Sequence, residues 1–376
     1  FYRNNPDNGG FAIFAGLQQV VEYIENLHFS EEDVEYLRSK RLFTEEFLEY
    51  LLHFRFRGDI YAMKEGTVMY PNEPVITVVA PLIDAQLIET TILLEINHQS
   101  LIATKTNRIV QAANGKPVSD FGARRAHNVD AAVYGARAAY IGGAAGTATV
   151  LAGKMFHIPI SGTMAHSWVM TFDSEYDAFK AYAESYPDGT VLLVDTYDVL
   201  KSGVPNAIRT AREVLEPMGK KLIGIRLDSG DLAYLSKEAR KMLDEAGLSD
   251  CMIVASNSLD EYTISSLNRQ GAKIDSYGVG ERLITSSSTP VFGAVYKLVA
   301  IQKDGKFIPK IKISETAEKI TNPGIKEVYR VYDENGKAVA DYLAVKGEQI
   351  RDFDPVRYVD PVNYWKNRSF VGCRFK

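Results

Sequence analysis

One histidine near the middle of the chain stands in a setting that suits chemistry. His166 lies in the stretch Gly162-Thr163-Met164-Ala165-His166-Ser167-Trp168, where small and hydroxyl-bearing neighbours leave backbone N–H groups free to meet an anion. The apolar run from Met155 to Ile160 precedes it and predicts a short buried strand. Because ligands bind at the carboxyl ends of strands in α/β proteins, we expect His166 to line a binding site; an ordinary polar loop histidine is the alternative.

Polar motifs also follow the other predicted strands. In chain order the motifs are Asp120-Phe121-Gly122-Ala123-Arg124-Arg125, Ser161-Gly162-Thr163-Met164-Ala165-His166-Ser167, Asp195-Thr196-Tyr197-Asp198, Arg226-Leu227-Asp228-Ser229-Gly230-Asp231, Ser256-Asn257-Ser258 and Tyr277-Gly278-Val279-Gly280-Glu281. In a barrel, all such loops open onto one face. We therefore expect these motifs to converge on a single cavity.

The residue types in these motifs suit a phosphorylated sugar with a metal ion. Guanidinium groups pair with phosphate or carboxylate, carboxylates accept from sugar hydroxyls or hold Mg²⁺ through water, and glycines let backbone amides approach phosphate oxygens. The arginines are Arg124, Arg125 and Arg226, the carboxylates are Asp195, Asp198, Asp228 and Asp231, and the glycines are Gly162, Gly230, Gly278 and Gly280. The sequence has no Gly-x-Ser-x-Gly string, so an acyl-transfer triad is not expected.

Several polar residues have a simpler structural interpretation. We expect one of Arg124 and Arg125 to pair with a surface carboxylate. The string Gly278-Val279-Gly280 lacks the third glycine of a dinucleotide fingerprint. The residues expected to cap helices are Asp198, Asp231 and Asp260, and those expected to pack rather than stack on a base are Tyr176, Tyr182 and Tyr186.

The composition argues against several classes of function. With 46% hydrophobic and 24% charged residues, the 376-residue chain is typical of a soluble globular protein. Its net charge of −5 argues against a nucleic-acid surface, and no apolar stretch reaches the roughly 18 residues of a membrane span. The cysteines, Cys251 and Cys373, are too few for a zinc site or a disulfide framework and suit a reducing cytoplasm. Because the chain opens at Phe1 without a methionine, we expect the natural protein to continue beyond both ends.

The elements that must position these motifs alternate along the chain after Asn114-Gly115. The predicted strands are 117–120, 155–160, 190–194, 221–226, 251–255 and 273–276, with 296–301 as a candidate to close the set, and predicted helices include 129–139, 204–216, 236–246 and 260–269. This alternation predicts a parallel sheet, and the number of units favours an irregular α/β barrel. Before it, residues 10–52 have helical spacing, 58–80 contain short strands, and 82–107 form a long helix.

Taken in order, the most specific strings resemble the nicotinate phosphoribosyltransferase family. They are Asp120-Phe121-Gly122-x-Arg124-Arg125, Gly162-Thr163-x-Ala165-His166-Ser167 and Arg226-x-Asp228-Ser229-Gly230-Asp231, and the resemblance extends from Asn8 through Gly280 to Lys297. It implies the irregular α/β barrel of the type II phosphoribosyltransferases at 111–304. It also implies a smaller mixed α+β domain at 1–110 that is completed by 305–376.

The resemblance implies a reaction as well. Members of the family transfer a 5-phosphoribosyl group from phosphoribosyl pyrophosphate to the pyridine nitrogen of nicotinate, which yields nicotinate mononucleotide and pyrophosphate at the start of NAD salvage. ATP is implied as a co-substrate that is hydrolysed through a phosphohistidine. Mg²⁺ is expected to be held mainly by pyrophosphate and water, with no direct protein ligand. A cytoplasmic homodimer with its sites at the interface is also implied, without a nucleic-acid or membrane partner.

The functional residues of the family carry over onto matching positions of this sequence. The catalytic residues implied are His166, as the phosphohistidine, and Arg226 and Asp228, on the floor of the base and ribose pocket. The substrate-binding residues implied are Phe121 and Arg124 at the pyridine ring, Asp195 at the ribose hydroxyls, Thr163 and Ser167 beside His166, and Ser256, Asn257, Gly278 and Gly280 at phosphate oxygens.

Other functions stay open at this point. Relatives that use nicotinamide carry an aspartate in the string Gly146-Thr147-Ala148-Thr149, where this chain has Ala148. Since an aspartate accepts from an amide but repels a carboxylate, Ala148 together with Arg124 favours nicotinate. The alternatives are a nicotinamide phosphoribosyltransferase, a quinolinate phosphoribosyltransferase, which has no use for His166, and a non-catalytic phosphate- or nucleotide-binding barrel.

Overall fold

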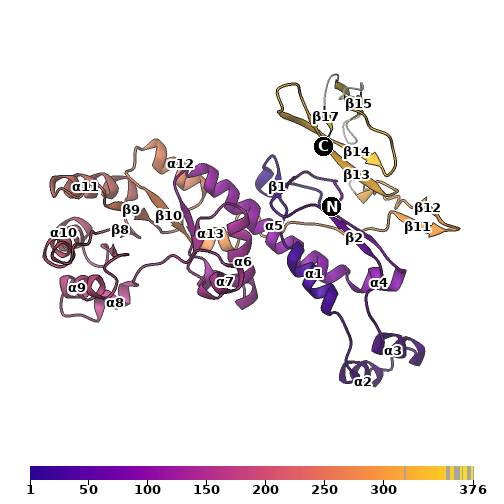
Figure 1. Ribbon diagram of the computed structural model, residues 1–376, viewed down its shortest axis with the longest axis horizontal. Helices are drawn as coiled ribbons and strands as arrows, with labels where there is room; N and C mark the ends of the chain where they lie inside the picture. Colours follow the sequence, from indigo (N-terminus) through magenta and orange to yellow (C-terminus); the bar gives the residue numbers. More distant parts are fainter. Residues whose placement is uncertain (317–318, 353–355, 360–364, 366, 371–373, 376) are drawn as a thin grey trace.

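The chain folds into two lobes that share one long helix (Figure 1). The structure is a computed structural model that describes residues 1–316, 319–352, 356–359, 365, 367–370 and 374–375. The shared helix is α5 (Glu89–Ala112), which contributes Ile96 and Leu101 to the core of one lobe and Ile102 and Ile109 to the core of the other. Cys251 is a buried free thiol, whereas Cys373 lies outside the described residues.

The first lobe contains a six-stranded parallel sheet in the order β6-β5-β10-β9-β8-β7. Its strands are β5 (Val118–Asp120), β6 (Gly146–Thr147), β7 (Val191–Leu193), β8 (Gly224–Leu227), β9 (Met252–Ala255) and β10 (Ser276–Val279). The central strands are apolar because helices cover the sheet, and Leu192, Ile225 and Ile253 are fully buried. This parallel sheet confirms the predicted α/β class.

The sheet curls into a barrel that stays open on one side. Beyond β6, Ile160 forms a parallel bridge with Thr147 and adds a single residue to that edge. At the opposite edge lies β7, which pairs with β8. His166 follows Ile160 by a short loop and contacts Asp195, which follows β7. The two edges therefore approach each other at the carboxyl rim without pairing along their length, and we call this gap the seam.

Helices surround the sheet, and five of the segments given below (α6, α9, η3, α11 and α12) begin at a side-chain cap. Asp231 accepts from the N–H groups of Ala233 and Tyr234, and Asp260 accepts from that of Thr263, as predicted. The helical segments of this lobe are η2 (Ala123–Arg125), α6 (Val129–Ile141), α7 (Val150–Phe156), α8 (His166–Met170), α9 (Glu175–Ser185), η3 (Val199–Gly203), α10 (Val204–Thr210), η4 (Ala211–Leu215), η5 (Glu216–Met218), α11 (Leu232–Glu245), α12 (Glu261–Arg269) and α13 (Glu281–Ile284).

The second lobe combines both ends of the chain (Figure 1). Ala294 bridges Tyr2, and Phe292 packs against the Tyr2 ring with centroids 4.6 Å apart. Its helices are η1 (Pro6–Asn8), α1 (Leu17–Asn26), α2 (Glu31–Ser39), α3 (Glu45–Leu52) and α4 (Leu82–Leu87), and its strands are β1 (Ala12–Ile13), β2 (Asp59–Ala62), β3 (Val68–Met69), β4 (Ile76–Val79), β11 (Ala300–Lys303), β12 (Lys306–Pro309), β13 (Lys326–Tyr332), β14 (Ala338–Val345), β15 (Val356–Val359), β16 (Asn367–Phe370) and β17 (Arg374–Phe375). This mixture of short antiparallel sheets and helices is the smaller α+β part.

Two strand predictions are wrong, and a third is displaced, because the predicted strand 273–276 shares only Ser276 with β10. The run 155–160 is not a strand, because α7 continues to Phe156 and ends at His157 in the left-handed conformation, which leaves Ile160 alone to bridge β6. The run 296–301 does not close the barrel, because β11 pairs antiparallel with β12 in the other lobe. A single bridging residue and a short helix produce no clear hydrophobic periodicity in the sequence. An apolar run of six residues is therefore compatible with a strand or with a helix.

Within the second lobe, a buried carboxyl group lies between the N-terminal part of the chain and the C-terminal strands β13 and β14. Glu73 accepts from the Tyr70 N–H at 2.9 Å, and Arg330 holds Asp341 with hydrogen bonds of 2.9 and 2.8 Å. Burial raises the pKa of the Glu73 carboxyl, and the neighbouring Asp341 carboxylate raises it further. Glu73 therefore keeps its proton in the folded chain at pH values where the unfolded chain has lost it.

This raised pKa predicts a loss of stability as the pH rises. Between the ordinary carboxyl range and the raised folded value, the folded state binds more protons, so the free energy of unfolding falls with increasing pH. We expect Glu73→Gln to stabilise the chain at pH 8 by about 1 kcal/mol, with the gain vanishing near pH 4. Thermal melts at both pH values measure this, and the exposed Glu46→Gln variant is the control. A gain of equal size at pH 4 and pH 8 would contradict the assignment.

No helix within the described ranges has the length and apolar character that crossing a membrane requires.

Candidate active site

Arg226 is the centre of a polar cluster at the carboxyl rim of the sheet. It lies on β8, and its guanidinium donates to Ser256 Oγ at 2.8 Å, to Thr163 Oγ1 at 2.9 Å and to Asp228 Oδ1 at 2.9 Å. The Ser256 hydroxyl also donates to Asp228. Only 16% of the Arg226 side chain is exposed, so these bonds form largely away from water and fix the plane of the guanidinium. The cluster brings together four of the predicted site residues.

Phe121 forms a wall beside this cluster. The Arg226 guanidinium carbon lies 5.4 Å from the centre of the Phe121 ring, within range of a cation–π contact. The Phe121 N–H donates to Val279 O at 2.8 Å, which ties its loop to β10. A Cβ atom at Gly278 would collide with the ring. Glycine is therefore needed at 278 to admit Phe121, a packing reason that the sequence analysis did not find; the phosphate contacts of Gly278 and Gly280 remain predictions.

His166 and Asp195 form a second polar group, across the seam. His166 Nε2 lies 3.0 Å from Asp195 Oδ1, and the Asp195 side chain is 1% exposed whereas that of His166 is 40% exposed. The other carboxylate oxygen, Oδ2, accepts from the Asp228 N–H at 3.1 Å and from the Ser229 hydroxyl at 2.5 Å. A buried carboxylate thus orients an accessible imidazole, the arrangement that a nucleophilic histidine requires.

These two groups are physically connected. Asp195 reaches the backbone of Asp228, and Asp228 reaches Arg226, which in turn holds Thr163 in the loop of His166. A movement of the His166 loop would therefore alter the hydrogen bonds of the Arg226 cluster directly. Ser229 takes part in this connection, although the sequence analysis included it in a motif without giving it a role.

Other predicted site residues lie outside the cluster. Arg124 lies exposed on η2, and Ser167 lies exposed on α8; within the described residues neither has a hydrogen-bonding or ionic partner. Asn257 adopts a left-handed conformation with φ of 97°, directly after Ser256. The roles of these residues toward a substrate stay predictions.

The simpler interpretations of the remaining polar residues are confirmed. Arg125 approaches the surface carboxylate of Glu281 at 3.5 Å. Asp198 caps η3 through the N–H groups of Leu200 and Lys201. The three tyrosines serve in packing, since Tyr176 lies under Arg209 and donates to Glu213, and Tyr182 packs against Tyr186.

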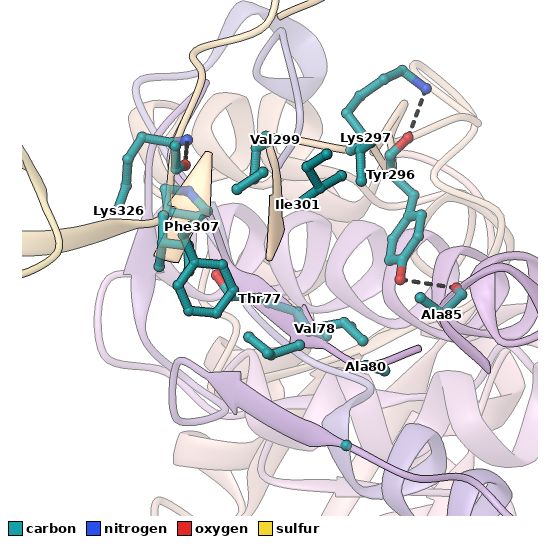
Figure 2. Close-up of a pocket in the computed structure, with 18 of the residues that line it drawn as sticks. Thr77, Val78, Ala80, Ala85, Tyr296, Lys297, Val299, Ile301, Phe307 and Lys326 are labelled. Atoms are coloured by element: carbon teal, nitrogen blue, oxygen red, sulfur yellow. Dashed lines mark hydrogen bonds between the residues drawn. The ribbon is translucent and has the colours of Figure 1, made fainter. Parts of the chain in front are cut away.

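A cavity of about 850 Å³ lies far from these residues, in the second lobe (Figure 2). It is lined mainly by apolar side chains of β4 and of residues 295–302, with Val78 on one side facing Val299 and Ile301 on the other. The amino group of Lys326 at its edge donates to the carbonyl oxygens of Asn322 and Gly324. None of the predicted site residues lines this cavity.

The cluster does not have the donor set of a directly ligated metal ion. Within the described residues, no group of three or more His, Cys, Asp or Glu side chains is placed to hold one. The carboxylates nearest the centre, Asp195 and Asp228, are engaged by His166, Ser229, Arg226 and Ser256.

Comparisons with known proteins agree along the whole chain. Residues 1–97 match the nicotinate phosphoribosyltransferase (NAPRTase) N-terminal domain, residues 117–336 the NAPRTase family, and residues 325–376 the C-terminal domain. The chain is 52% identical over 364 residues to the nicotinate phosphoribosyltransferase of Bacillus subtilis (strain 168), covering 96% of this chain and 74% of the relative. It is 40% identical over 400 residues to that of Dictyostelium discoideum, covering 94% and 67%.

Solved structures share the fold. The structure of human nicotinic acid phosphoribosyltransferase superimposes with a TM-score of 0.85 at 27% identity, covering 100% of this chain and 83% of the human chain. A nicotinate-nucleotide pyrophosphorylase from Pyrococcus furiosus superimposes with a TM-score of 0.69 at 26% identity, covering 99% and 81%. The chain belongs to the nicotinate phosphoribosyltransferase family.

Proposed function

We propose that this chain transfers the 5-phosphoribosyl group of phosphoribosyl pyrophosphate to nicotinate, releasing pyrophosphate and nicotinate mononucleotide, and that it couples this transfer to ATP hydrolysis. The product is a precursor of NAD, so the reaction is the entry of nicotinic acid into NAD salvage. The observation that carries the proposal is the connected chain of contacts from His166 through Asp195 and Asp228 to Arg226. It supports the proposal because an accessible imidazole and a firmly held guanidinium lie on the same rim, where they suit a nucleophile and an anion-binding group.

The Arg226 cluster suits the ribosyl-transfer step. Ribosyl transfer passes through an oxocarbenium-like state, so the protein must position the pyridine nitrogen and stabilise the departing pyrophosphate. Arg226 is held in one plane by its neighbours and stands against the Phe121 ring. That geometry offers a flat wall for a pyridine ring and a fixed cation for an anion, while the Asp228 carboxylate is placed to accept from ribose hydroxyls.

His166 suits the coupling to ATP. Transfer of a phosphoryl group to its imidazole would put negative charge beside the buried Asp195 carboxylate, which lies 3.0 Å from the ring. That repulsion favours release of the His166 loop, and Thr163 in the same loop bonds to Arg226. We propose that this is how hydrolysis at His166 changes substrate affinity at Arg226.

The Mg²⁺ ion that the family implies does not fit a direct protein site among the described residues. We propose that it would arrive with the diphosphate group of phosphoribosyl pyrophosphate, whose negative charge it would neutralise, and would leave with pyrophosphate. The protein's part is then to supply hydrogen bonds to the anion through residues such as Arg226 and Ser256.

One assay tests the proposed function. Purified protein, phosphoribosyl pyrophosphate and nicotinate are expected to release pyrophosphate, and ATP is expected to increase that release. No pyrophosphate release with or without ATP would instead support a non-catalytic binding barrel. Quinolinate as sole base is expected to be inactive.

The base preference gives a further prediction at Ala148, whose N–H donates to Asp120 O at 2.8 Å. We expect Ala148→Asp to lower kcat/KM for nicotinate by about 10- to 100-fold, because a second carboxylate repels the substrate carboxylate. The same variant should gain activity with nicotinamide, whose amide can donate to it. Steady-state kinetics with both bases measure the switch. Ala148→Asn is the uncharged control, and an equal loss in that variant would mean that size and not charge is responsible.

We also propose that the chain acts as a homodimer, in the cytoplasm. The support is an apolar surface on α7, where Val150, Leu151 and Met155 are 64%, 48% and 48% exposed and Ile160 beside them is 64% exposed. A second copy of the chain would cover this surface next to the seam. The mass of the protein in solution tests the proposal.

A further inference from the structure

Asp120 is a buried carboxylate that the proposed reaction has not used. Its side chain ends β5 and is fully buried, and within the described residues no cation pairs with it. Oδ1 accepts from the Gly122 N–H at 2.8 Å, and Oδ2 accepts from the Thr147 hydroxyl at 2.8 Å. Burial raises the pKa of the Asp120 carboxyl, against the effect of these two bonds. Burying a carboxyl group destabilises the folded state unless its hydrogen bonds offset the lost hydration, so the two partners of Asp120 matter.

On one side, these bonds fix the loop that carries Phe121 and Arg124. The Gly122 N–H is held by Asp120, and the Gly122 carbonyl accepts from the Arg125 N–H at 2.8 Å, which starts η2. A Cβ at Gly122 would lie 2.5 Å from the Cβ of Ile284, so the loop passes tightly between Asp120 and α13. The path of the chain into Arg124 is therefore set at Asp120.

On the other side, the bonds fix the stretch that contains Ala148. The Thr147 hydroxyl donates to Asp120 and accepts from the Thr149 N–H at 3.0 Å, while the Ala148 N–H donates to the Asp120 carbonyl at 2.8 Å. Both the side chain and the backbone of Asp120 thus hold residues 147–149. Thr147 is itself fully buried and cannot reach a substrate.

We propose that Asp120, acting through Thr147, is a positioning residue for the pyridine base: it locks the Phe121–Arg124 loop and the Ala148 stretch to each other at a fixed separation. The proposal rests on the proposed function. Phe121, Arg124 and Ala148, which we propose to face the base, lie on these two segments, whereas the hydrogen bonds that hold Arg226 come from β8, the residue after β9 and the His166 loop. Loosening the Asp120–Thr147 bond should therefore weaken binding of the base and leave binding of phosphoribosyl pyrophosphate unchanged.

A matched pair of variants tests this. Thr147→Val keeps the shape of the side chain but removes the hydroxyl, so that Asp120 and the Thr149 N–H both lose a partner. We expect the KM for nicotinate to rise about 10-fold or more, with the KM for phosphoribosyl pyrophosphate within about twofold of the wild type. Thr147→Ser keeps the hydroxyl and should restore the nicotinate KM.

The outcomes separate the possible roles. A lower melting temperature with both KM values unchanged, or an equal rise in both, would overturn the proposal, because either result describes a merely structural bond. If Thr147→Val does not fold, Asp120→Asn takes its place: its amide oxygen still accepts from Gly122, and its NH₂ group replaces an acceptor at Thr147. The same selective rise in nicotinate KM is expected, and its absence would overturn the proposal. Wild-type protein that releases no pyrophosphate would instead contradict the proposed function.

Discussion

Replacing Arg226 with lysine is expected to lower kcat/KM for both substrates by about 100- to 1000-fold, although the positive charge remains. Arg226 donates from separate nitrogens to Ser256, Thr163 and Asp228, and a lysine amine at the end of a flexible chain cannot keep all of these partners at once. Each lost bond to a charged group costs about 1.5–3 kcal/mol, and about 1.4 kcal/mol corresponds to a tenfold change in rate. The loss of two bonds at the lower end of this range, about 1.5–2 kcal/mol each, therefore corresponds to the expected 100- to 1000-fold decrease.

A surface arginine, Arg125, provides the control for this experiment. Arg125 lies on the surface, 3.5 Å from Glu281, with both side chains more than half exposed. Exposed pairs of this kind contribute about 0–1 kcal/mol, so Arg125→Lys should leave kcat/KM nearly unchanged. If Arg226→Lys had no more effect than Arg125→Lys, the Arg226 cluster would not be the substrate site.

His166→Asn is expected to abolish ATP hydrolysis while some ATP-independent ribosyl transfer remains. Asparagine cannot accept a phosphoryl group, but its NH₂ group can still donate to Asp195, which holds the imidazole at 3.0 Å. The local structure should therefore survive, and the ATPase rate should fall by more than about 1000-fold, as expected for the loss of a catalytic nucleophile. Separate measurements of phosphate release from ATP and pyrophosphate release from phosphoribosyl pyrophosphate distinguish the two activities.

His157→Asn is the matched control for the histidine. His157 is exposed and adopts a left-handed conformation with φ of 56°, which asparagine accepts more readily than most residues. This variant should keep both activities. An ATPase rate that survives in His166→Asn would remove His166 from the coupling step.

Much of the sheet was predictable because strands buried on both faces of a parallel sheet have nearly continuous apolar sequences. The runs ending at Asp120, Val194, Arg226 and Ala255 correspond to β5, β7, β8 and β9, and the polar residue at the end of each run or directly after it lies at the rim. The run before His166 misled because a helix end and a single bridging residue have no period of their own. The dipeptide strand Gly146–Thr147 is likewise too short to leave a pattern.

The site was only partly predictable for a different reason. Residue types indicate which groups can bind an anion, and Arg226, Asp228 and His166 were chosen in that way. They do not indicate which partners meet across the fold: the contact of His166 with Asp195 depends on the curl of the sheet, and the bond of Asp120 to Thr147 joins residues 27 positions apart. Gly278 was expected at a phosphate, whereas its missing side chain is explained by the Phe121 ring.

The seam also has a mechanical consequence. In a closed barrel, strain at one strand is shared by hydrogen-bonded neighbours on both sides, so the circumference is fixed. Here the ring of strands is interrupted at the seam, between Ile160 and β7. The His166–Asp195 hydrogen bond crosses this gap. A change of charge on the His166 imidazole would strengthen or break this hydrogen bond, and so narrow or widen the seam at the carboxyl rim. Chemistry at the edge of the ring can then act on a substrate at its centre without passing through the rigid strands between them.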